Sequence, residues 1–144
     1  MTLFVTPISP ISPITVLSPI ILTLVTGHSA LKREEAIWVA IKSVMATSLQ
    51  HPPRIIGVIL EGLPSGKFSA DPTDPNVHIK RVAPGCLCCV GLLTLRVTLN
   101  RLLRNNPGLL YISIADATHI DQVRTILTSA PYDKWLTVSN NIDT

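Results

Sequence analysis

Residues 20–26 read Ile-Ile-Leu-Thr-Leu-Val-Thr, and Gly27 follows them directly. A continuous apolar run of this length that ends at a glycine is typical of a β-strand buried on both faces. Such strands occur in parallel sheets whose faces are covered by helices. The stretch therefore predicts the first strand of an α/β domain.

The residues that follow Gly27 change to a helical period. Apolar side chains recur at helical spacing from Ala36 to Met45, glutamates precede them, and His51-Pro52-Pro53 ends the helix. Further strands are predicted at 55–60, 77–82, 109–115 and 135–139, and further helices at 92–103 and 121–129. This β-α-β-β-α-β-α-β order predicts a mostly parallel sheet with helices on its faces.

The length and composition of the chain fit one folded domain. A chain of 144 residues buries roughly 68–70% of its unfolded surface on folding. With 47% hydrophobic and 15% charged residues, it is too apolar to remain disordered. The net charge of +3 is spread from Lys32 to Lys134, which argues against a polybasic nucleic-acid arm, although not against a local basic patch.

The first 31 residues contain no Lys, Arg, Asp or Glu. A signal peptide needs a positive region before its apolar stretch, whereas the first basic residue here is Lys32. Four prolines within the first 19 residues argue against a membrane helix. We expect a Pro-rich, poorly ordered extension over residues 1–19 and a single domain over residues 20–144, with membrane association as the alternative.

All three cysteines lie within four positions, at Cys86, Cys88 and Cys89. This spacing cannot form a disulfide framework, so it favours a reducing compartment, the cytoplasm. Three thiols in four residues can converge on one soft metal ion, and Cys86 and Cys89 have the Cys-x-x-Cys spacing of a metal half-site. The alternative is that they pack as small apolar side chains.

The cysteine segment also carries a family resemblance. The stretch from Arg81 to Ile126, with Gly-Cys-Leu-Cys-Cys before a leucine-rich helix and an apolar strand, resembles the metal-binding segment of the CobW-like GTPases, relatives of HypB and UreG. Arg54 to Glu61 resembles the second strand and Asn-Glu loop of that family, and the resemblance covers most of residues 20–139.

The resemblance implies a three-layer P-loop-NTPase-like fold, GTP hydrolysis and a Cys-x-Cys-Cys site that holds zinc or a similar divalent metal for delivery. It places Glu61 where a carboxylate can complete the thiolate site.

The phosphate-binding loop departs from the pattern of nucleotide-binding proteins. That loop reads Gly-x-x-x-x-Gly-Lys-Ser/Thr, and counting from Gly27 the last three positions hold Lys32, Arg33 and Glu34. Arg33 can pair with a phosphate but cannot supply the point charge of lysine. Glu34 adds negative charge where a hydroxyl should meet the metal-bound nucleotide. An ordinary strand-to-helix loop explains the same residues.

Two further nucleotide motifs of the family are altered or lacking. Ser113-Ile114-Ala115-Asp116-Ala117 stands in place of a Glu-Thr-Thr-Gly-like switch. Asp116 can contact magnesium or cap the helix that follows. No Asn-Lys-x-Asp guanine motif appears by Thr144, so we expect a domain that is incomplete at its C-terminal end.

Together these features predict a zinc-like metal-binding domain with little or no nucleotide hydrolysis, which delivers its metal to a recipient metalloprotein. One alternative is a small metal-coupled GTPase in which Gly27, Lys32, Arg33 and Asp116 bind GTP and magnesium. The other is an inactive fragment of such an enzyme. A mean hydropathy of +0.41 also points to self-association as a homo-oligomer.

Overall fold

The structure is a computed structural model that describes residues 19–47, 54–62, 74–83 and 91–144. Its elements, in chain order, are β1 (Ile20–Thr26), α1 (Ala30–Thr47), β2 (Ile56–Glu61), β3 (Val77–Val82), α2 (Gly91–Leu103), β4 (Leu109–Ile114), the 3-10 turn η1 (Ala117–His119), α3 (Ile120–Leu127), the 3-10 turn η2 (Tyr132–Lys134), β5 (Leu136–Val138) and β6 (Ile142–Asp143). The extension predicted over residues 1–19 lies outside this part of the chain except for its last residue.

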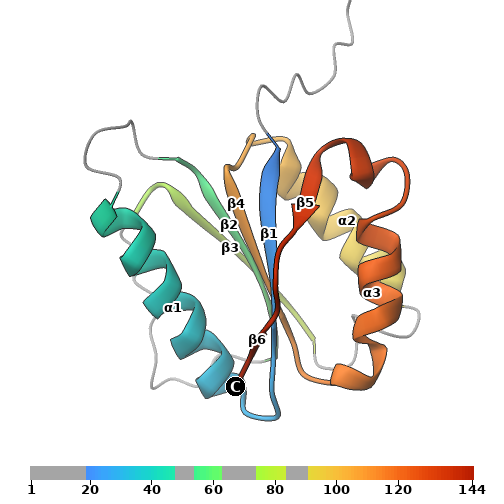
Figure 1. The fold of residues 1–144 in the computed structure, drawn as a ribbon, viewed down its shortest axis with the longest axis horizontal. Helices are drawn as coiled ribbons and strands as arrows, with labels where there is room; N and C mark the ends of the chain where they lie inside the picture. The colour runs from blue at the N-terminus through green and yellow to red at the C-terminus, as the bar shows by residue number, and fades with distance from the viewer. Residues whose placement is uncertain (1–18, 48–53, 63–73, 84–90) are drawn as a thin grey trace, which may run out of the picture.

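The strands form one sheet in the order β3-β2-β4-β1-β5 (Figure 1). Each strand pair is parallel, which confirms the predicted parallel sheet. The apolar run that begins the domain, β1, pairs with β4 from Ile21 to Thr26. On its other side, β1 pairs with β5 from Ile20 to Leu22 and with β6 at Val25 and Thr26. The strand β5 was predicted from the sequence, and β6 was not.

Helices cover both faces of the sheet and create three layers. In Figure 1, α1 lies on one side of the sheet and α2 and α3 lie on the other. The α1 side buries Ile37, Trp38 and Ile41 against the sheet. The opposite side buries leucines of α2 together with Val123 and Leu127 of α3. The predicted three-layer α/β architecture is therefore confirmed.

The start of α1 shows how closely the helix follows the first strand. Ser29 caps the helix, because its Oγ accepts a hydrogen bond from the Lys32 amide at 3.2 Å and its carbonyl accepts one from the Arg33 amide at 3.0 Å. Only Gly27, His28 and Ser29 separate β1 from α1. This short connection places the first turns of α1, which contain Arg33 and Glu34, close to the carboxyl ends of the strands.

No helix in the described part of the chain is long and apolar enough to span a bilayer.

Candidate functional site

Buried polar side chains gather at the carboxyl edge of the sheet. Within the described residues, the buried polar and charged side chains are Thr26, Arg33, Glu34, Glu61 and Ser113. Three of them lie at or next to the ends of β1, β2 and β4, and the other two lie near the start of α1. Ligands of open parallel sheets bind at this edge, so it is the candidate site.

Arg33 lies at the centre of this cluster and is 2% exposed. Its Nε donates to Ser113 Oγ at 2.6 Å, Nη1 donates to the Gly27 carbonyl at 2.5 Å, and Nη2 donates to the Glu61 carbonyl at 2.9 Å. Burial lowers the pKa of Arg33, whereas the negative charges of Glu61 and Glu34 act in the opposite direction. One guanidinium thus joins α1 to the ends of β1, β2 and β4.

The next residue, Glu34, is 3% exposed and forms an ion pair with Arg81 of β3. Arg81 Nη2 lies 2.8 Å from Glu34 Oε1, and 27% of the Arg81 side chain is exposed. Neither carboxylate oxygen of Glu34 has a hydrogen-bond partner of normal geometry within the described residues, so the pair is held mainly by charge. Arg33, Glu34, Glu61 and Arg81 together carry two positive and two negative charges.

Glu61 ends β2 and links it to the end of β4. The side chain is 4% exposed, and its Oε1 accepts a hydrogen bond from the Ala115 amide at 2.6 Å. Glu61 lies in register with Val82, the last residue of β3, and the Gly62 amide donates to the Val82 carbonyl at 2.9 Å. The carboxylate predicted as a metal ligand therefore lies beside the strand that leads into the cysteine segment.

The predicted thiolate ligands Cys86, Cys88 and Cys89 lie outside the described residues. Cys86 is the fourth residue after Val82, so the Cα atoms of the two residues are at most about 14 Å apart. Within the described residues, the structure places no three His, Cys, Asp or Glu side chains close enough together to bind a metal. The predicted thiolate ligands therefore follow in sequence the strand whose last residue, Val82, lies in register with Glu61.

The other three residues predicted to bind a nucleotide, Gly27, Lys32 and Asp116, each have a different structural setting. Gly27 has φ +150°, and a Cβ atom there would lie 1.9 Å from Thr144 Oγ1, so the close approach of Thr144 requires glycine. Lys32 is exposed. Asp116 caps η1, the turn before α3, because its Oδ1 accepts hydrogen bonds from the Thr118 amide at 2.9 Å and from Thr118 Oγ1 at 2.7 Å.

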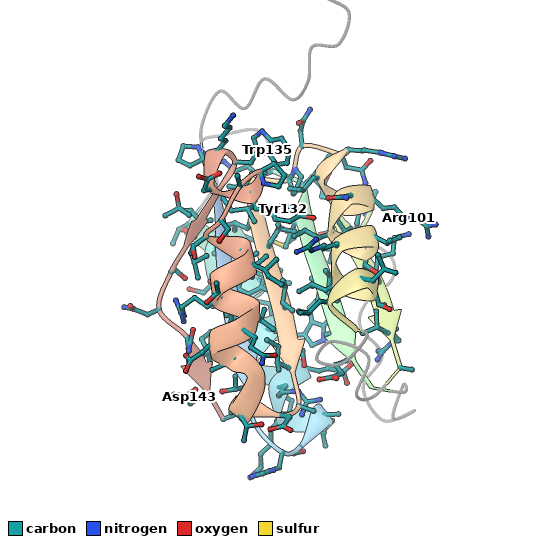
Figure 2. The ribbon with its side chains drawn as sticks, turned by 90° about the vertical axis from the view of Figure 1, so that its right-hand side faces the viewer. Arg101, Tyr132, Trp135 and Asp143 are labelled. Atoms are coloured by element: carbon teal, nitrogen blue, oxygen red, sulfur yellow. The ribbon has the colours of Figure 1, made fainter. Side chains whose placement is uncertain are left out.

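Sequence reasoning missed three partners at this edge. Ser113 lies inside an apolar run, and a polar residue at a doubly buried strand position was a usable signal, since buried polar groups need hydrogen-bond partners. The pairing of Arg81 with Glu34 had no such signal, because it joins residues far apart in the chain. The same holds for the 2.6 Å hydrogen bond that Thr26 Oγ1 donates to Asp143 Oδ1; Figure 2 labels Asp143 near this edge.

Comparison with known proteins gives one partial match. Over 64 residues the chain is 36% identical to the zinc chaperone YeiR of Escherichia coli (strain K12). The match covers 44% of this chain and 20% of that protein, so the chain corresponds to about a fifth of the relative's length. No family model and no solved structure matches. Part of this α/β domain is therefore similar in sequence to a zinc chaperone.

Proposed function

We propose that this chain is a metal-binding domain related to the CobW-like proteins, which holds zinc or a similar divalent metal in the cytoplasm and delivers it to a recipient metalloprotein. The observation that carries this proposal is the partial similarity to a zinc chaperone in a chain with three clustered cysteines. In this proposal, Cys86, Cys88 and Cys89 bind the metal as thiolates and Glu61 supplies a carboxylate.

The position of Glu61 supports this ligand set. Thiolates bind zinc and other soft or borderline metals, and a carboxylate oxygen can complete a tetrahedral zinc site. Metal-binding carboxylates are commonly hydrogen-bonded by a neighbouring group that fixes their orientation. The Ala115 amide donates such a bond to Glu61 Oε1, and Glu61 lies beside the strand end that leads to the cysteines.

Little or no nucleotide hydrolysis is part of the same proposal. A phosphate loop needs a lysine that contacts phosphate and a hydroxyl that contacts magnesium. At those positions Arg33 donates to three protein groups and Glu34 pairs with Arg81. The alternative remains a small metal-coupled GTPase that uses Gly27, Lys32, Arg33 and Asp116.

Zinc affinity of the full reduced chain tests the proposal. Competition with a chromophoric zinc chelator measures both the number of zinc ions bound and the affinity. We expect about one zinc ion per chain, because the four proposed ligands complete one tetrahedral site. Cys86→Ser and Glu61→Gln each remove a proposed ligand, so each should weaken binding at least about 10-fold, the smallest usual effect of losing even an outer-shell partner. Asp133→Asn, an exposed carboxylate in η2, is the matched control and should bind like the parent chain.

Two results would contradict the metal-binding proposal: a reduced chain that binds no zinc, or a variant with all three cysteines changed to serine that binds zinc as tightly as the parent.

The same samples with GTP and magnesium separate the two candidate functions. A ligand that binds only the folded state raises the melting temperature. We expect no such rise. A rise that Asp116→Asn abolishes would favour the GTPase instead.

A further inference from the structure

We infer that Arg33 is a positioning residue: it sets the place of Glu61 at the carboxyl edge without the help of a bound nucleotide. The inference deepens the proposed function, because Glu61 is the carboxylate ligand of the metal site proposed above.

The first argument is the geometry of the hydrogen bonds. A guanidinium is a planar fork with five N–H donors, so a single side chain can bind several acceptors at fixed angles. In Arg33, the three nitrogens donate to groups on three different segments: Ser113 in β4, the Gly27 carbonyl after β1 and the Glu61 carbonyl at the end of β2. No other natural side chain has three donor nitrogens in one planar fork, so Arg33 fixes the relative positions of the three strand ends.

The second argument is charge. A buried cation is tolerated when opposite charges and hydrogen bonds surround it. The carboxylates of Glu61 and Glu34 both act on Arg33, and Glu34 in turn pairs with Arg81 of β3. The cluster is neutral as a whole, so its order does not depend on an added anion such as a phosphate group.

The third argument connects Arg33 to the carboxylate itself. Arg33 holds the backbone of Glu61 through its carbonyl, and the side chain of Glu61 then reaches the Ala115 amide through Oε1. If the backbone of Glu61 shifts, this 2.6 Å bond must lengthen or break. The exchange rate of the Ala115 amide therefore reports on the position of the Glu61 carboxylate.

Amide hydrogen exchange measured by NMR tests this coupling on the full chain. Arg33→Lys keeps the positive charge, but its three N–H donors share one nitrogen and cannot reproduce the planar arrangement of the three bonds. Arg33→Met also removes the charge. The control is Arg101→Met, because Arg101 is exposed on α2 and points away from the sheet (Figure 2). The reference amide is that of Ile20, which donates to the Trp135 carbonyl at the opposite edge of the sheet.

We expect exchange at Ala115, divided by exchange at Ile20, to rise at least about 10-fold in Arg33→Lys and more in Arg33→Met, which corresponds to about 1.4 kcal/mol of lost protection. The ratio removes any general loss of stability, which raises exchange at both amides. If Arg33→Met does not fold, Arg33→Lys decides the question. A ratio within about twofold of the parent value in Arg33→Lys would overturn the inference.

Zinc binding by the same variants separates this inference from the proposed function. We expect Arg33→Lys to bind zinc more weakly and Arg101→Met to bind it like the parent chain. If the parent chain binds no zinc but the Ala115 ratio rises, the positioning role holds and the proposed metal site fails. If zinc binds normally and the ratio stays unchanged, the metal site holds and the positioning role fails.

Discussion

At the scale of single residues, the two buried tyrosines determine how the stability of the domain depends on alkaline pH. Tyr111 lies in β4 and is buried against the α1 side of the core. Tyr132 is buried on the opposite side, where its hydroxyl donates to Asn100 Oδ1 at 2.9 Å. Burial raises the pKa of Tyr111, and it also raises the pKa of Tyr132 against the opposing effect of the positive charge of Arg96.

These raised values predict a loss of stability at alkaline pH. Tyrosine in the unfolded chain titrates near pH 10, and the folded chain holds its phenol protons more tightly. The resulting stabilisation is complete below about pH 10 and is lost as the pH rises through the folded pKa values. We expect ultraviolet phenolate absorbance to increase only above pH 10, together with loss of the circular dichroism signal.

Tyr111→Phe provides the control for this titration. It leaves Tyr132 as the one tyrosine of the chain, so half of the phenolate signal should vanish and the alkaline loss of stability should become smaller. Phenolate formation near pH 10 in a chain that remains folded would contradict the prediction.

At the scale of elements, the packing of α2 on β2 depends on a glycine. A Cβ atom on Gly57 would lie 2.5 Å from Leu110 Cδ2 and 3.4 Å from Leu102 Cδ1. Leu102 belongs to α2 and Leu110 to β4, and both are buried. Gly57 therefore leaves the space that these leucines fill, and any side chain there would have to displace one of them.

Gly57→Ala should destabilise the fold by about 1–3 kcal/mol, the usual cost of adding a methyl group to a packed core. Urea unfolding measures this loss. Leu110→Val shortens the leucine that the new methyl group would strike, so Gly57→Ala/Leu110→Val should lose less free energy than the sum of the two single changes. Strictly additive losses would show that the two residues do not compete for the same space.

Most elements could be predicted from the sequence because each has a local period. The predicted strands at 20–26, 55–60 and 77–82 match β1, β2 and β3 to within one residue. The two-residue β6 was missed, since Ile142–Asp143 is too short to show any period and is ordered by its pairing with Val25 and Thr26 of β1. Pairing partners of this kind come from tertiary contacts.

At the scale of the whole molecule, one sheet serves two cores. The core on the α1 side contains Trp38, and Trp135 packs against the core on the α2 and α3 side; Figure 2 labels Trp135 on the latter side. Both cores use alternate side chains of the same strands, such as Leu24 and Val25 of β1. Neither core can therefore be lost while the other stays intact.

This shared sheet predicts a single cooperative unfolding transition. Trp135→Phe leaves Trp38 as the fluorescent probe of one core, and Trp38→Phe leaves Trp135 as the probe of the other. In each variant we expect the urea midpoint from tryptophan fluorescence to coincide with that from circular dichroism. An earlier fluorescence transition for Trp38 alone would mean that α1 detaches before the sheet unfolds.

The sequence by itself determined the α/β class, the parallel sheet and the order of all helices and strands except β6, because apolar periodicity is a property of neighbouring residues. It also pointed to the cysteine cluster, to Glu61 and to the altered phosphate loop. The tertiary structure alone decided the strand order and the cluster in which Arg33 contacts Ser113, Gly27 and Glu61. The physical reason is that strand order and buried charge pairs depend on contacts between segments far apart in the chain. The local pattern of apolar residues does not specify these contacts.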